Sequence, residues 1–207
     1  MKQRLFFACV LFILVASCHP NRKKTNAISE AEKTIARKTL QVPADFSTID
    51  KAYATIISAI KNCNEMVFDQ FIPTSGLFII FTTRAKKCGV KKIYHINEFE
   101  QKEETIFDKD KRHLPLKFKH EPLPVKNCQE KNIYNKRGTF GRGINVLNIT
   151  GLMNDCITDY IQISEILSEA SEVSYTVLNT NLGFFYFKSE KGQWKLNFLD
   201  IRKPCDY

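Results

Sequence analysis

The sequence predicts an α+β fold in which an N-terminal helix packs on a curved antiparallel sheet that ends in a β-meander. Apolar residues between Ile49 and Ile60 recur at helical spacing. Residues 77–83 form a short apolar run rich in β-formers, and residues 173–201 hold three strand-like runs separated by turns. A helix followed by a group of strands is typical of the α+β class.

The first helix is expected to begin after Ser47, because Ser47 and Asp50 have the spacing of an N-terminal cap. It runs to about Cys63, and apolar residues leave open a continuation to Phe71. Residues 73–76, which contain proline and glycine, then end it.

The strand at 77–83 is apolar on both faces, so it should be covered on both sides. A second short strand is expected at 93–96. Residues 97–145 combine an acidic patch, a basic patch and three prolines, which favours long loops with short strands. Residues 161–170 predict a short helix, and the terminal meander is expected at 173–180, 184–189 and 194–201, with glycine in both turns.

The N-terminus has the pattern of an export signal. Lys2 and Arg4 precede an apolar run at 5–16, which is too short for a stable membrane span. Small residues directly before Cys18 resemble the lipobox of bacterial lipoproteins, although Val15 stands where that family prefers leucine. The resemblance implies cleavage before Cys18 and its modification by diacylglycerol and fatty acid, such as palmitate.

This resemblance divides the chain into a signal peptide (1–17), a lipidated N-terminus and tether (18–45) and one α+β domain (46–207). It implies a bacterial cell-envelope protein held to a membrane by its lipid. The basic stretch at 22–24 lies where surface-exported lipoproteins of some groups carry acidic residues. We therefore expect the outer membrane, facing the periplasm.

The helix, the strand at 77–83 and the strand start at 192–196 resemble the NTF2-like and cystatin-like cone folds. Such cones typically enclose an apolar cavity, and the chain has 16 Phe and 7 Tyr. These rings either line a pocket or fill the core, and we favour a filled core. The fold itself does not specify an activity.

The sequence contains no recognisable catalytic or metal-binding motif, so no catalytic residue, metal or cofactor is expected. Cys88 with His95 is the nearest Cys–His pair, and His113 and His120 with Cys128 are the nearest metal-ligand group, but neither spacing enforces convergence.

Glu98 to Glu104 favours a solvated acidic face. Residues 138–143 hold three glycines in an order that does not match a dinucleotide fingerprint, so they are expected to form a flexible turn.

Five cysteines after Cys18 predict disulfides, because an exported protein meets an oxidising compartment. Spacing leaves their pairing open. Our first choice is Cys128 with Cys156, since that bond would close a segment without its own core. The alternative is that some of these cysteines are unpaired and act as small buried hydrophobic residues.

The chain has a net charge of +9 and two basic segments, at 84–92 and 109–120. Nucleic acid is excluded as a partner because an exported chain does not meet it routinely. An acidic envelope component or a protein partner fits better. We therefore expect a non-enzymatic binding or scaffolding module. The alternative is an enzyme or small-ligand binder with an aromatic-lined cone pocket.

Overall fold

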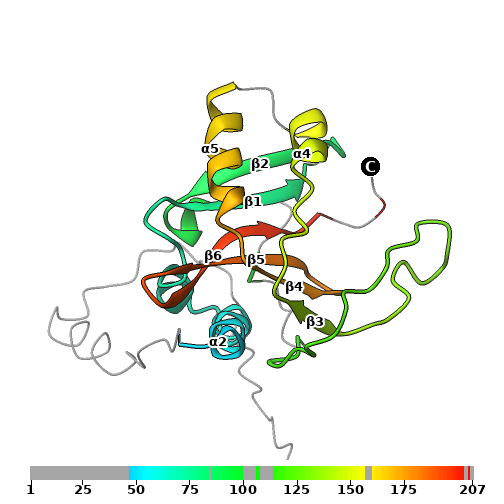
Figure 1. Cartoon of the computed structure of the whole chain (residues 1–207), viewed down its shortest axis with the longest axis horizontal. Helices are drawn as coiled ribbons and strands as arrows, with labels where there is room; N and C mark the ends of the chain where they lie inside the picture. The colour runs from blue at the N-terminus through cyan, green and yellow to red at the C-terminus, as the bar shows by residue number, and fades with distance from the viewer. Residues whose placement is uncertain are drawn as a thin grey trace, which may run out of the picture.

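The computed structural model describes residues 47–83, 85–99, 106–107, 114–156, 160–202 and 205. Its centre is a curved sheet of six strands in the order β2-β1-β6-β5-β4-β3 (Figure 1). The strands are β1 (Leu77–Thr82), β2 (Cys88–Ile93), β3 (Thr139–Arg142), β4 (Tyr175–Asn179), β5 (Gly183–Glu190) and β6 (Gln193–Asp200).

The sheet is mixed, so the prediction of an antiparallel sheet is wrong for one strand pairing. The meander of β4, β5 and β6 is confirmed, and each of its pairings is antiparallel. However, β6 also pairs with β1, and these two strands run parallel, with Ile79 opposite Leu199. The direction of β6 is set by the hairpin with β5, and its other edge meets a strand that points the same way.

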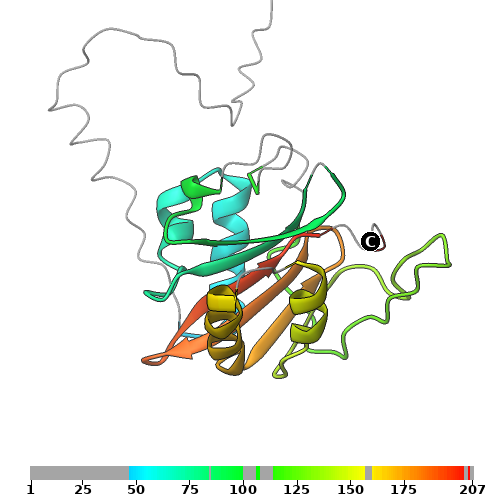
Figure 2. The ribbon, with the colours of Figure 1, turned by 90° about the horizontal axis from the view of Figure 1, so that it is seen from above.

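Helices cover both faces of this sheet. They are α2 (Ile49–Lys61), α3 (Glu65–Asp69), α4 (Ile149–Asp155) and α5 (Tyr160–Ser171), with one 3-10 turn, η1 (Ile96–Glu98). Figure 2 shows α2 and α3 on one side of the sheet and α4 and α5 on the other. The expected helix on a sheet is present as α2, but α4 and α5 add a further layer.

The start of α2 lies close to the predicted position. The Thr48 hydroxyl caps the helix by accepting a hydrogen bond from the Lys51 backbone N–H at 3.3 Å. The continuation of this helix to Phe71 is wrong, because α3 is a separate helix. Its N-cap is Asn64, whose side chain accepts a hydrogen bond from the Val67 backbone N–H at 3.1 Å.

Two other local predictions are corrected. The second strand occupies 88–93 rather than 93–96, because its residues form a hairpin with β1 and the chain then turns into η1. The expected flexible turn at 138–143 contains β3, which pairs with β4. Gly141 lies in this strand, and a Cβ at this position would overlap the ring of Phe118. The close approach of the ring therefore requires glycine here.

The aromatic residues on the α2 side fill the core. Tyr53, Phe185 and Phe187 are fully buried, and the Tyr53 ring meets the rings of Phe118 and Phe185 edge to face at 5.4 Å. The Tyr53 hydroxyl accepts a hydrogen bond from the Asn179 side chain at 3.0 Å. Burial raises the pKa of Tyr53, so this phenol stays neutral inside the core.

Candidate functional site

The main candidate site is a surface cluster that we call the aromatic rim: Asp50, Phe118, His120, Tyr175 and Trp194. Four separate segments of the chain supply these side chains. Asp50 lies in the first turn of α2, Tyr175 begins β4, Trp194 is the second residue of β6, and Phe118 and His120 precede β3. Phe118, Tyr175 and Trp194 belong to or pack against the core on the α2 side, and His120 contacts Asp50, Phe118 and Tyr175.

His120 connects the polar members of the rim. Its Nε2 lies 3.0 Å from Asp50 Oδ1, and its Nδ1 lies 3.0 Å from the Tyr175 hydroxyl. The side chains of His120 and Asp50 are 58% and 53% exposed. The imidazole and the carboxylate are therefore positioned by each other and are open to solvent.

Aromatic rings lie next to this polar pair. The Phe118 ring lies 4.8 Å from the His120 ring, and the Tyr175 ring meets Trp194 edge to face at 5.9 Å. Phe118 is buried, whereas Tyr175 and Trp194 are partly exposed. The buried ring of Phe118 therefore contacts Gly141 in β3 as well as the His120 ring.

The electrostatics of the rim keep the Tyr175 phenol in its neutral form. Burial raises the pKa of Tyr175, and the negative charge of Asp50 raises it further. The phenol therefore stays protonated at neutral pH and can donate a hydrogen bond to His120 Nδ1. The Nε2–H of the imidazole then faces Asp50. A phenol in this state is not a ready general base, but the cluster presents both ring surfaces and hydrogen-bonding groups.

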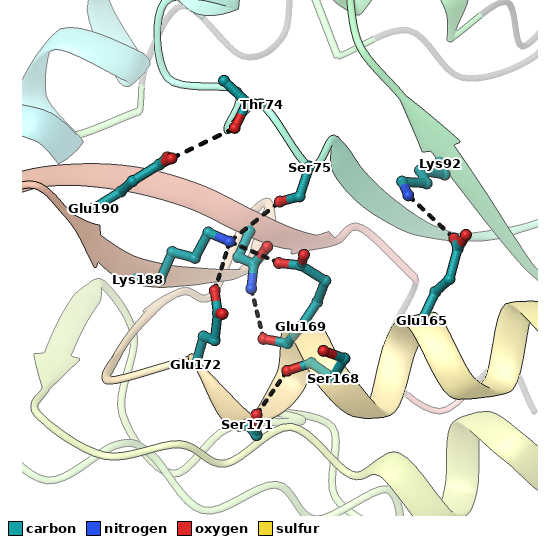
Figure 3. A network of polar contacts seen from close by, with 11 residues as sticks. Thr74, Ser75, Lys92, Glu165, Ser168, Glu169, Ser171, Glu172, Lys188 and Glu190 are labelled. Atoms are coloured by element: carbon teal, nitrogen blue, oxygen red, sulfur yellow. Dashed lines mark hydrogen bonds and ion pairs between the residues drawn. The ribbon is translucent and has the colours of Figure 1, made fainter.

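A second cluster centres on Lys188 of β5 (Figure 3). Its Nζ lies 2.7 Å from a carboxylate oxygen of Glu169, 2.7 Å from one of Glu172 and 3.1 Å from the Ser75 hydroxyl. The Lys188 side chain is only 8% exposed. Lys92 of β2 forms a similar but more exposed pair with Glu165, also on α5, at 3.1 Å.

The neighbouring serine and lysine do not form a catalytic pair. A lysine activates a serine only when its amine is neutral. Burial alone would lower the pKa of Lys188, but hydrogen bonds to Glu169 and Glu172, together with their charges, outweigh burial and raise it. The ammonium group persists, and the cluster ties the C-terminal end of α5 to the sheet and to the turn before β1.

The predicted disulfide residues are both bonded, but not to each other. The structure pairs Cys88 with Cys156 and Cys128 with Cys205, at Cα separations of 4.7 and 5.5 Å. Disulfide formation is thus confirmed among the described residues, and the pair Cys128–Cys156 is wrong. Cys156 ends α4 beside the start of β2, while Cys128 lies in the loop next to Cys205 near the end of the chain. A disulfide needs such short Cα distances, which sequence spacing does not reveal. Cys18 lies outside the described residues.

The candidate Cys–His pair does not form. Cys88 is bonded to Cys156, and His95 Nδ1 instead contacts Asp69 Oδ2 at 3.2 Å.

The candidate metal group is also not assembled, because His120 belongs to the rim and Cys128 to a disulfide. His113 lies outside the described residues. Within the part of the chain that is described, no three His, Cys, Asp or Glu side chains are placed to hold a metal ion.

Glu98 of the acidic stretch accepts hydrogen bonds from the backbone of Tyr94 and His95.

Sequence reasoning did not find the rim. Asp50, His120 and Tyr175 are far apart in the chain and have no common spacing. Gly141 was expected in a flexible turn, whereas in β3 it marks the close approach of the Phe118 ring, as glycine in a strand often does.

No protein-family model matches the chain, and no curated protein or solved structure matches it significantly. Of the helices in the described ranges, none is both long and apolar enough to cross a membrane.

Proposed function

We propose that this chain is a lipid-anchored protein of the bacterial envelope and acts as a non-enzymatic binding module through its aromatic rim. The observation that carries the binding proposal is the solvent-open His120–Asp50 pair set among aromatic rings. The polar pair is held in place by Tyr175, so little ordering is needed when a ligand binds.

An envelope glycan fits the rim best. The rings of Tyr175 and Trp194 suit the C–H faces of sugars, and the imidazole and carboxylate suit hydroxyl groups. A protein partner would favour a contiguous apolar surface. The most exposed large apolar side chains in the described ranges instead belong to separate segments, among them Met66, Tyr94 and Val125.

The enzyme alternative has less support. Lys188 is held as an ammonium by two glutamates, and Tyr175 is held as a neutral phenol, so neither supplies a base at neutral pH. The aromatic side chains that an internal pocket would need are packed against one another on the α2 side. These observations favour recognition at the surface.

The anchor and the finer fold are part of the same proposal. The lipobox-like residues before Cys18 support lipidation, and the basic stretch that follows supports an outer-membrane protein facing the periplasm. A helix that precedes a curved sheet with a terminal meander supports an NTF2-like or cystatin-like relationship. The α4 and α5 layer would be an addition to that cone.

The test is co-sedimentation of the full chain, in lipid nanodiscs, with insoluble glycan prepared from a bacterial envelope and stripped of protein. His120→Gln and Asp50→Asn should each weaken binding about tenfold, which corresponds to one lost hydrogen bond to the ligand. Both side chains are more than half exposed, so folding should be preserved.

His95→Gln is the matched control, because His95 is 66% exposed and pairs with Asp69 away from the rim. It should leave binding unchanged. Equal binding by the His120→Gln variant and the wild-type protein would reject the rim as the binding surface. If the wild-type protein does not bind glycan but binds a protein specifically at the rim, the glycan is rejected as the ligand.

A further inference from the structure

Arg202 holds its guanidinium against the Cys88–Cys156 disulfide. Two of its nitrogens, Nε and Nη2, donate to the two carboxylate oxygens of Asp200 at 2.9 and 2.6 Å. The third nitrogen, Nη1, lies 3.6 Å from Cys88 Sγ and 3.9 Å from Cys156 Sγ. Asp200 thus fixes the side chain so that its remaining N–H groups point at both sulfurs.

The second disulfide provides an internal comparison. Among the described residues, no guanidinium lies against the sulfurs of Cys128 and Cys205. Cys128 is exposed and Cys205 is partly exposed, whereas Cys88 and Cys156 are both only partly exposed. If access alone controlled reduction, the Cys128–Cys205 bond would open first.

The position of Arg202 favours thiol–disulfide exchange at the Cys88–Cys156 bond. When an external thiolate attacks one sulfur, the other sulfur leaves as a thiolate, and a more stable leaving thiolate makes the step faster. A cationic N–H donor stabilises a thiolate. Because Nη1 is near both sulfurs, it can serve whichever cysteine leaves.

We propose that Cys88–Cys156 is a redox-exchange site whose co-reactant is a dithiol protein. One thiolate of the dithiol attacks Cys88 Sγ or Cys156 Sγ, the S–S bond breaks, and a mixed disulfide forms. The second thiol of the partner, as its thiolate, then attacks the mixed disulfide and releases the chain. The two cysteines end as thiols with the two protons of the dithiol, and the partner is oxidised to its disulfide.

Opening this bond would release a specific structural tie. Cys88 begins β2, which lies at the edge of the sheet, and Cys156 is the C-cap of α4 on the α5 side. Reduction therefore detaches the end of α4 from the edge strand while the rest of the sheet keeps its hydrogen bonds. This proposal is independent of the binding function assigned to the rim.

The test is timed reduction of the full chain in nanodiscs with dithiothreitol at neutral pH, followed by alkylation and mass spectrometry. Cys88 and Cys156 should become labelled about tenfold faster than Cys128 and Cys205, against the order that exposure predicts. In urea, where Arg202 no longer contacts the sulfurs, this difference should disappear. Faster opening of Cys128–Cys205 in the native protein would overturn the proposal.

Arg202→Gln should slow opening of Cys88–Cys156 and leave the rate at Cys128–Cys205 unchanged. In the reduced chain, the pH profile of alkylation at Cys88 and Cys156 should lie at lower pH than for an ordinary thiol, and Arg202→Gln should shift it upward. Arg202→Lys keeps the positive charge and should restore part of the shift. An identical pH profile in all three proteins would also overturn the proposal.

Discussion

Replacing Lys188 with methionine should destabilise the fold, because the variant leaves carboxylates without their cation. The Glu169 side chain is only 15% exposed. Without Lys188, its negative charge would stay largely buried and unpaired. Glu172 is 54% exposed and can turn towards solvent. The single variant therefore resembles a broken buried ion pair at Glu169 and a broken surface ion pair at Glu172.

Breaking a buried ion pair costs about 3–5 kcal/mol, and a surface pair contributes about 0–1 kcal/mol. Partial exposure of Glu169 places the Lys188→Met variant near the lower end, at about 3 kcal/mol of lost unfolding free energy. For a chain of this size that corresponds to a decrease in Tm of roughly 6–12 °C.

The measurement is urea unfolding with disulfides intact, followed by the fluorescence of Trp194. The double variant Lys188→Met with Glu169→Leu removes both buried charges and should recover most of the loss, to within about 1 kcal/mol of the unmodified chain. Lys136→Met is the control, because Lys136 pairs with Glu121 at 3.7 Å with both side chains about half exposed, and it should cost less than about 0.5 kcal/mol.

The pH dependence follows from the raised pKa of Lys188. Its stabilising effect is fully present below the unfolded lysine pKa of 10.5 and is lost as the pH rises through the higher folded value. The lysine should therefore add no pH dependence near neutrality. A loss under about 1 kcal/mol for Lys188→Met, or a double variant as unstable as the single one, would refute the reasoning.

Three further predictions concern other parts of the chain. Cys18→Ala should abolish incorporation of labelled fatty acid, and continued labelling would contradict lipidation at this residue. Chains that begin at Asp45 and at His19 should unfold at the same midpoint, because the tether has little apolar surface, and a loss of several degrees would show that it docks. Gly141→Ala should cost about 2 kcal/mol in thermal unfolding, since the new Cβ overlaps the Phe118 ring; an unchanged Tm would show that the ring moves aside freely.

The elements that could be predicted carry their signal within a few neighbouring residues. The face of α2 repeats at helical spacing, and Ile56 and Ile57 are fully buried as that pattern requires. The terminal meander has β-rich runs joined by short turns, and all three strands are present. In these segments local preference and tertiary packing agree, so the sequence pattern is sufficient to predict the helix and the strands.

The elements that were missed depend on partners far along the chain. The strand β3 is short and contains glycine, and it is a strand because Phe140 pairs opposite Leu178 in β4. The parallel contact of β1 with β6 has no local signal either. The same applies to the rim, whose His120–Asp50 contact joins residues 70 positions apart, and to the disulfides Cys88–Cys156 and Cys128–Cys205. No single segment contains that information.

The two proposed sites lie on opposite faces of the sheet, which makes them separable. The rim borders the core on the α2 side, to which Tyr175 and Trp194 belong, whereas Cys88 and Cys156 pack against the core on the α5 side. In a packed interior, the effect of a local opening reaches another site through elements that contact one another. Reduction of Cys88–Cys156 should therefore leave glycan binding at His120 unchanged, and His120→Gln should leave the rate of disulfide exchange unchanged. Coupling between the two measurements would mean that α4 and the sheet edge move together with the rim.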